Sequence, residues 1–506
     1  MAAATEQTLL LPPPVPALRG TVFAAIASTW IASFAAAADS TITATLSSTI
    51  ANEFQSLTVI SWLGSGYLIG LTVTQPLCGK LSDIFGRNAS YLFAALVFAA
   101  GNLVCGLAGS QSTLILGRVV AGVGGGGCSS ISTIITSDYV APRSRGLWYS
   151  FGMGIYTVGM ACGAVMGGAI NDALGWRWAF IILAPIAVVA GGGVAVFLPQ
   201  RTAGVDSFYQ QLCRIDYGGS ITLVSSVALL LIYLNQDTDD SRAATEGLLA
   251  KTAIPLAAIL LALFIVIELC WAREPIMPLP IFRTPSVLAA CLSSWLMPVS
   301  VFTLTFYIPL YLQLRGYSTS ETGVRLLPQS IGAGLGSFTA GLVTRHTGKY
   351  STVKIIMPSL LVFGAAGFVT ISMTSPPVLT EIYLFLHGAG FGGLQTVLFL
   401  ALLSAVPFSE QATSTCVLLA FRSIGSTVGV SAAGIVFRSR LGHQDGHGHG
   451  HGNDGTLDQD AHMSALHATF ILALASAVAG FVAVLFVRDF ALRSTVKDCS
   501  ESLVEG

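Results

Sequence analysis

Long apolar stretches separated by short polar ones occupy most of the chain. A stretch of about 18 or more apolar residues is long enough to cross the hydrocarbon core of a bilayer as a helix. Fourteen such stretches can be counted, at 21–46, 58–78, 91–109, 113–136, 147–170, 177–198, 216–235, 251–271, 286–312, 323–344, 353–374, 378–404, 412–437 and 463–487. The pattern therefore predicts fourteen transmembrane helices, with a kink at Pro298 or Pro309 in the ninth.

The composition favours the same class of protein. Of the 506 residues, 53% are hydrophobic and 10% are charged, whereas a soluble protein carries roughly 25% charged residues. The mean hydropathy is +0.74. We therefore expect an all-α polytopic membrane protein in a lipid bilayer. The net charge of −1 and the lack of a basic tract favour no nucleic-acid partner.

Lysine and arginine are distributed unevenly between the two sides of the membrane. If the N-terminus is cytosolic, the segments on the inner side hold 15 of these residues and the segments on the outer side hold 7. Cytosolic segments of membrane proteins carry the excess of basic residues. This bias predicts that both termini lie in the cytosol.

A charged segment with glycines at intervals joins the second and third apolar stretches. It reads Gly79-Lys80-Leu-Ser-Asp83-Ile-Phe-Gly86-Arg87. We expect a tight loop in which the two glycines relax the backbone, and in which Asp83 caps the next helix or pairs with an arginine. An ordinary connector between helices is the alternative interpretation.

A second segment of this kind, Gly341 to Lys349, follows the tenth stretch on the same side of the membrane. This repeat predicts two parallel six-helix halves, with helices seven and eight inserted between them. The expected organisation is a disordered cytosolic tail at 1–20, a six-helix bundle at 21–198, a linker with two inserted helices at 199–272, a second six-helix bundle at 273–487 that includes a His-rich loop at 442–462, and a cytosolic tail at 488–506.

Two ionisable residues lie inside apolar stretches, where charge is costly and is therefore a sign of function. Asp39 follows Ala36-Ala37-Ala38 in the first stretch and could exchange a proton or bind a cationic substrate; alternatively, the helix ends at Ala38 and Asp39 begins a loop. Arg118, in the fourth stretch, needs a partner, and Asp39 or a helix-end carbonyl could serve. The alternative is an arginine that reaches water at the outer face.

Helix five carries glycines at a spacing of four from Gly159. Together, Gly159, Gly163, Gly167 and Gly168 predict a seam of close helix packing. Such a seam fits simple packing and also fits two halves that rock against each other.

Other polar residues give weaker signals. In the His-rich loop, His447, His449 and His451 are weak candidates for binding Zn²⁺ or Cu²⁺, and a neutral spacer is the favoured interpretation. His387 fits a buried structural histidine better than a proton relay. We expect Arg422 near the cytosolic end of its helix, paired with Glu410 or a lipid phosphate. No catalytic constellation and no phosphate-binding loop occur, so we expect no enzymatic activity, no cofactor and no resident metal.

These motifs resemble those of the 14-helix drug:proton antiporter branch of the major facilitator superfamily. Gly79–Arg87 is similar to the loop motif between helices two and three, and Asp39-Ser-Thr-Ile42 to the acidic motif of helix one. Arg118–Gly126 is similar to the arginine motif of helix four, with Ala121 in place of the usual Gln. Gly159–Gly168 is similar to the antiporter motif of helix five, with Ala164 in place of the usual Pro.

Within this branch, the chain resembles most the fungal vacuolar basic amino-acid transporters. The segments that carry this resemblance are 61–68, 75–80 and 137–146, together with the acidic dileucine pattern Glu6-Gln-Thr-Leu-Leu10-Leu11, which resembles vacuolar routing signals. The resemblance implies a proton-coupled antiporter, expected as a monomer, that moves lysine, arginine and histidine from the cytosol into the vacuole. Asp39 and Arg118 would couple proton and substrate, and Lys80, Asp83 and Arg87 would hold the inward face closed through pairs that break when it opens.

Three other functions compete with this interpretation. A multidrug or toxin exporter at the plasma membrane shares the fold and the motifs. A receptor built on the transporter fold is a second possibility, and the intact Asp39 and Arg118 argue against it. A metal carrier that uses the His-rich loop is the third.

Overall fold

The computed structural model describes residues 20–55, 58–199, 210–211, 214–234, 244–271, 275–277, 279–317, 319–445 and 455–489. Within these ranges every regular element is helical. The long helices of the first half are α2 (Gly20–Phe54), α3 (Thr58–Phe85), α4 (Arg87–Gly106), α5 (Gln111–Tyr139), α6 (Arg145–Leu174) and α7 (Trp176–Phe197).

Two further helices, α9 (Tyr217–Leu234) and α10 (Ala244–Cys270), precede the second half. The second half consists of α11 (Pro285–Leu314), α12 (Thr319–Thr347), α13 (Ser351–Val369), α14 (Pro377–Ala405), α15 (Gln411–Asp445) and α16 (Gly455–Leu485). Each of the fourteen long helices in the described ranges overlaps one of the predicted apolar stretches. α11 runs continuously through both of its internal prolines.

Eleven helices in the described part of the chain are long and apolar enough to cross a membrane. The others are α9, whose apolar stretch is Tyr217–Leu230, and α3 and α12. α3 and α12 are the second helices of their halves, and each packs against a helix of the other half. Their glycine and polar positions thus face protein as well as lipid.

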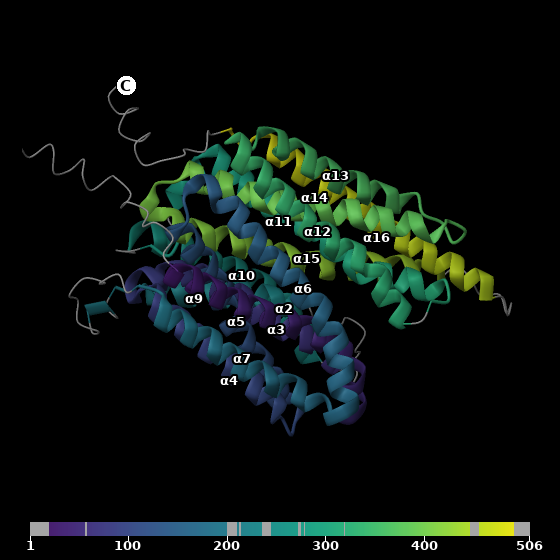
Figure 1. The fold of residues 1–506 in the computed structure, drawn as a ribbon. Coiled ribbons are helices and arrows are strands. Elements are labelled where there is room, and N and C mark those ends of the chain that lie inside the picture. Colours follow the sequence, from purple (N-terminus) through teal and green to yellow (C-terminus); the bar gives the residue numbers. More distant parts are fainter. Residues whose placement is uncertain are drawn as a thin grey trace, which may run out of the picture.

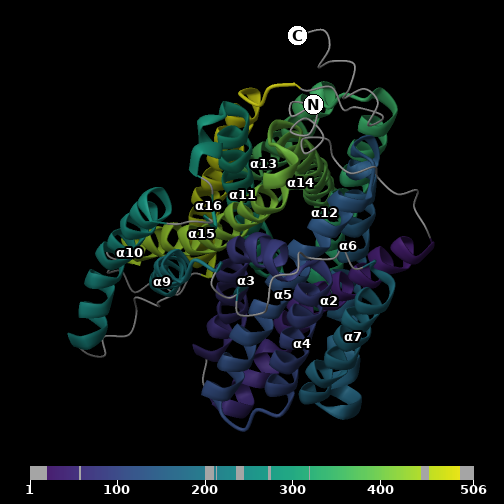
Figure 2. The same cartoon turned by 90° about the vertical axis from the view of Figure 1, so that its left-hand side faces the viewer.

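In Figure 1 most of the purple to blue helices lie below the green to yellow helices, and the blue helix α6 runs from the upper group down to the lower one. The two halves meet mainly where α6 packs on α12 and where α3 packs on α15. α9 packs on α10 and on α3, and Figure 2 shows the pair to one side of the two bundles, beside α15.

Single glycines make the tightest turns between helices. Gly86 (φ 86°) alone separates α3 from α4, and Gly175 (φ 88°) alone separates α6 from α7. Gly348, after α12, also has a positive φ of 67°. A residue with a Cβ is strained in this region of backbone space, so these turns require glycine. We name the two ends of the molecule by these residues: the Gly86 end, which includes 138–145 and 345–348, and the Gly175 end.

The predicted loop at 79–87 is wrong in its extent. Residues 79–85 form the last turns of α3, and only Gly86 departs from the helix. Gly79 lies within the helix and does not form a turn of the backbone. A Cβ on Gly79 would lie 2.8 Å from Thr413 Cα on α15, so the missing side chain allows two helices of different halves to touch.

Candidate functional site

Asp39 lies inside α2, which continues for fifteen residues beyond it to Phe54. The alternative that a loop begins at Asp39 is therefore wrong. Its side chain is fully buried, with 0% of its surface exposed. The hydroxyl of Thr43, one turn later, donates to the backbone carbonyl of Asp39 at 2.7 Å. α2 packs here between α6 and α7, with α5 alongside.

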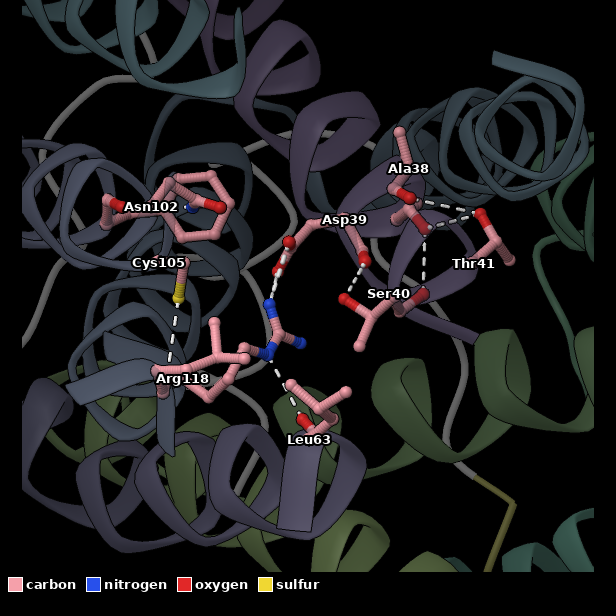
Figure 3. A network of polar contacts seen from close by, with 12 residues as sticks. Ala38, Asp39, Ser40, Thr41, Leu63, Asn102, Cys105 and Arg118 are labelled. Atoms are coloured by element: carbon pink, nitrogen blue, oxygen red, sulfur yellow. Dashed lines mark hydrogen bonds and ion pairs between the residues drawn. The ribbon is translucent and has the colours of Figure 1, made fainter. Parts of the chain in front are cut away.

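Arg118 on α5 is the partner of Asp39. Its Nη1 lies 2.8 Å from both carboxylate oxygens of Asp39, and its Nε donates to the backbone carbonyl of Leu63 at 3.0 Å. Figure 3 shows the guanidinium between these two acceptors. Arg118 is only 1% exposed. The alternative of an arginine that reaches water is therefore wrong. Of the two expected partners Asp39 is present, whereas the carbonyl belongs to Leu63 inside α3 and not to a helix end.

Aromatic rings enclose the pair. The guanidinium carbon lies 4.7 Å from the ring centroid of Tyr67 and 5.8 Å from that of Phe180, distances at which a cation is attracted to a ring face. Tyr67 was not singled out as a site residue in the sequence. The contact depends on how α3 is rotated about its axis, and no motif reveals that rotation.

The glycine run of α5 allows two helices to approach the site. A Cβ on Gly126 would lie 2.6 Å from the carbonyl oxygen of Leu71 on α3. On the opposite side, a Cβ on Gly124 would overlap the backbone of Phe98 on α4. α5 is thus wedged between α3 and α4, which positions Arg118 towards α2.

The arrangement can respond to a proton. Two oppositely charged groups away from water are stable only as a pair, and loss of either charge leaves the other uncompensated. Protonation of Asp39 would remove the negative charge and weaken the bonds that Arg118 donates to the carboxylate. The pair can therefore link the presence of one proton to the packing of α2 against α5.

The glycine seam of α6 lies against α2. A Cβ on Gly159 would stand 2.6 Å from the carbonyl oxygen of Phe34, and a Cβ on Gly163 would stand 2.6 Å from Ala38 Cα, next to Asp39. A Cβ on Gly167 would stand 3.3 Å from Ile42 Cα.

The prediction for the fourth seam residue is wrong. No atom of the described residues lies within 4 Å of the point where a Cβ on Gly168 would stand. The helix that meets the seam belongs to the same half as α6, so the seam is not a surface between halves.

The charged residues at the Gly86 end join helices of the first half. Arg87 Nη1 lies 2.6 Å from Asp83 Oδ1, and Arg87 Nε donates to Asp138 Oδ2 at 3.0 Å. Lys80 lies within electrostatic range of Asp83 and of Glu268 on α10. Through Asp83 and Asp138, Arg87 therefore holds the ends of α3, α4 and α5 together.

Other residues connect the two halves at this end. Arg143 donates to the carbonyl oxygens of Arg345 and His346, at 2.8 and 2.9 Å. Arg145 donates to Gln411 Oε1 at 3.3 Å, and Ser150 donates to the carbonyl of Ser337. These contacts hold the two halves together at the Gly86 end.

The two halves contact each other reciprocally. Gly79, seven residues before Gly86, touches α15 of the second half. Gly341, seven residues before Gly348, lies against Gly146 and Leu147 on α6 of the first half, where its Cβ would be 2.8 Å from the carbonyl oxygen of Gly146. The repeat in the sequence thus corresponds to a repeat in the packing.

The histidines singled out in the sequence form no metal site in the described part of the chain. His387 is fully buried on α14, and its Nε2 lies 3.1 Å from Ser300 Oγ. His447, His449, His451 and the dileucine pattern fall outside the described residues. In the part of the chain that the structure describes, no group of three or more His, Cys, Asp or Glu residues could hold a metal ion.

Comparisons with known proteins agree on one superfamily. The sequence profile of the Major Facilitator Superfamily matches residues 29–430. The Multidrug resistance protein fnx1 of Schizosaccharomyces pombe is 32% identical, over 85% of this chain and 82% of its own length. The Vacuolar basic amino acid transporter 2 of Saccharomyces cerevisiae is 30% identical, over 76% of this chain and 83% of its own.

The fold has solved counterparts. The proton:xylose symporter XylE superimposes with a TM-score of 0.62 at 14% identity, covering 95% of this chain and 98% of that one. At this level of identity the likeness concerns the fold alone.

Proposed function

Because the chain belongs to the major facilitator superfamily, and is therefore a transporter rather than an enzyme, we propose that it is a proton-coupled antiporter. It exports small molecules from the cytosol, and its substrates are basic amino acids that it moves into the vacuole. It works as a monomer and without a cofactor.

The observation that carries this proposal is the buried pair of Asp39 and Arg118. A carboxylate with 0% exposure and an arginine with 1% exposure, bonded at 2.8 Å, are expensive to place inside a membrane. A transporter that must bind and release a proton in each cycle has a use for such a pair, because protonation changes the charge balance between two packed helices.

The contacts at the Gly86 end support alternating access between residues 21–198 and 273–487. The basic residues of the chain favour a cytosolic location for this end. With the Gly86 end closed, the substrate path opens towards the opposite side, which is the lumen. Loss of the contacts made by Gly79, Arg143 and Gly341 would open the cytosolic side, and the proton and substrate would bias which side is open.

The experiment is uptake of labelled lysine or arginine by purified protein in proteoliposomes. An acidic interior should drive uptake above the level at equal pH, and Asp39→Asn should abolish the difference. If wild-type vesicles take up neither lysine nor arginine, whether the interior is acidic or at the outside pH, the proposed substrates are wrong.

A multidrug exporter at the plasma membrane is the second candidate. It is favoured by the likeness to the Multidrug resistance protein fnx1, which extends over more of the chain than the likeness to the vacuolar transporter. Transport of cationic dyes by the same vesicles, without transport of lysine, would select it. The location of the protein can be tested separately. If the dileucine pattern acts as a routing signal, a Leu10→Ala/Leu11→Ala variant should no longer be found in the vacuolar membrane.

A further inference from the structure

Arg422, on α15, is an intramembrane arginine that has no acidic partner among the residues that the structure describes. Among the described residues, its Nη1 donates a hydrogen bond to the hydroxyl of Tyr149. At 3.5 Å this bond is as long as a hydrogen bond can be. No carboxylate among the described residues lies within 4.0 Å of its guanidinium nitrogens. The expected pairing with Glu410 is therefore wrong.

Its position is deep in the membrane and between the two halves. Arg422 comes eleven residues after Gln411, the first residue of α15, which corresponds to about 16 Å along the helix axis or half of the ~30 Å hydrocarbon core. Its partner Tyr149 belongs to α6 of the first half. The next residue, Ser423, donates to Gln75 on α3, also in the first half, at 2.8 Å. A lipid headgroup at the membrane surface is thus not the neighbour of Arg422.

Three polar side chains lie around Arg422 and its neighbour Ser423, namely those of Tyr149, Tyr156 and Gln75. Tyr149 is stacked on Phe399, with ring centroids 4.7 Å apart, so its hydroxyl is held in place. Tyr156 lies within electrostatic range of Arg422 and also of Tyr67, the ring that contacts Arg118. The Nε2 of Gln75 is buried and has no hydrogen-bond partner in the described part of the chain.

The chemistry of this set selects the ligand. A guanidinium, two phenol hydroxyls and an amide can all donate, and a carboxylate only accepts. Arginine and carboxylate form paired bonds of matching geometry. An anionic group is also the one that removes the cost of an uncompensated cation inside the membrane.

We propose that Arg422 binds the carboxylate of the transported substrate at the interface between the halves. This inference rests on the proposed transport function and narrows its substrates to molecules that carry a carboxylate, such as free amino acids. It places the anionic group of the substrate on α15 and the proton on α2, in different halves. A bound substrate would thus contact both halves, while the proton would bind to Asp39 in its pair with Arg118.

The test uses pairs of ligands that differ in the carboxylate. Lysine is compared with cadaverine, and rhodamine 110 with its methyl ester rhodamine 123, by measuring binding to the purified full-length protein. The wild type should prefer the carboxylate member of a pair, and Arg422→Gln should lose about 10- to 100-fold of affinity for that member only. Arg422→Lys keeps the charge without the paired geometry and should retain part of the preference.

Arg315→Gln is the matched control. Arg315 also contacts a tyrosine hydroxyl, that of Tyr311 at 3.0 Å, but at the end of α11. This variant should leave the preference unchanged, and a monodisperse elution profile shows that each variant is folded.

The outcomes separate this inference from the proposed substrates. A wild-type protein that prefers the carboxylate member of neither pair overturns the inference, as does a preference that survives in Arg422→Gln. The inference is also overturned if Arg422→Gln loses affinity only when anionic lipids are present, and equally for both members of a pair. That result would assign Arg422 to a lipid phosphate. If rhodamine 110 is preferred through Arg422 while lysine does not bind, the inference holds and the basic amino-acid substrates are rejected.

Discussion

Arg118 and Arg422 both lie inside membrane-spanning helices, but their electrostatic surroundings differ. Arg118 has a carboxylate, a main-chain carbonyl and an aromatic ring face as partners and is almost completely buried. Arg422 is partly exposed and has one long hydrogen bond to a phenol. The first arginine is satisfied by the protein, and the second is available to a ligand. The two residues therefore suit different tasks, which are proton coupling and substrate binding.

Removal of one charge from the buried pair should destabilise the protein. Asp39→Asn leaves Arg118 without a counter-charge, and loss of one partner of a buried ion pair costs about 3–5 kcal/mol. The double variant Asp39→Asn/Arg118→Gln removes both charges and should recover part of this loss. Unfolding in detergent, followed for both single variants and the double variant, measures the coupling. Additive effects of the two substitutions would contradict a direct pair.

The pH dependence of one surface pair can be predicted with its sign. Glu53, at the end of α2, accepts hydrogen bonds from Arg177 and Trp176 on α7, and the bond to Arg177 holds the pKa of Glu53 below its ordinary value of 4.5. The pair therefore stabilises the protein fully above pH 4.5, and this contribution is lost as the pH falls through the lower, folded-state pKa. Glu53→Gln should lower the melting temperature at pH 7, and the difference should shrink below pH 4.5.

The effect should be small, because both side chains are about 40% exposed; such pairs contribute less than about 1 kcal/mol. Asp172→Asn is the control, since Asp172 lies at the same end and, among the described residues, accepts only a long hydrogen bond from Asn171. A difference between wild type and Glu53→Gln that does not vary with pH would contradict this account.

Charged residues in apolar stretches could be identified from the sequence because their cost makes them conspicuous. Asp39 and Arg118 were found in this way, and Asp39 was one of the two kinds of partner expected for Arg118. The carbonyl of Leu63, the ring of Tyr67 and the direction of Arg422 could not be predicted. Each depends on how a helix is rotated against its neighbours, and glycines of α3 and α5 that touch backbone set that rotation.

At the scale of single helices, the glycine seam of α6 gives opposite predictions for two neighbouring glycines. An added methyl group at Gly163 would meet Ala38 at 2.6 Å, so Gly163→Ala should destabilise by about 1–3 kcal/mol through overpacking. Gly168 has open space, and there Gly168→Ala should stabilise the helix by about 0.5–1 kcal/mol. Thermal unfolding of the two variants tests the seam, and equal effects would refute it.

Helix existence could be predicted well, because the length of an apolar run is set by the thickness of the bilayer. Helix ends could not. The polar residues at 79–85 look like a loop, yet they continue α3, where Asp83 pairs with Arg87 in the first turn of α4. In such a segment only a residue with positive φ, here Gly86, marks the end of the helix.

At the scale of the whole molecule, Gly79 and Gly341 make equivalent contacts between the halves. Substitution of either by a larger residue should separate the halves at the Gly86 end and populate a state open to the cytosol. Distances between spin labels at Ala89→Cys and Lys349→Cys, without other accessible cysteines, should lengthen in Gly79→Leu and Gly341→Leu. Gly64→Leu on α3, which has nothing within 4 Å, is the control. An unchanged distance distribution in both variants would show that these contacts do not hold the end closed.

Exchange of a proton for substrate through the Asp39–Arg118 pair can be measured as proton flux. Proteoliposomes that contain a pH-sensitive dye, at equal pH inside and outside, are given an inward lysine gradient. Wild-type vesicles should become alkaline inside, because protons leave as lysine enters. Asp39→Asn should exchange labelled for unlabelled lysine without any change of interior pH. Alkalinisation by Asp39→Asn at the wild-type rate would contradict the account.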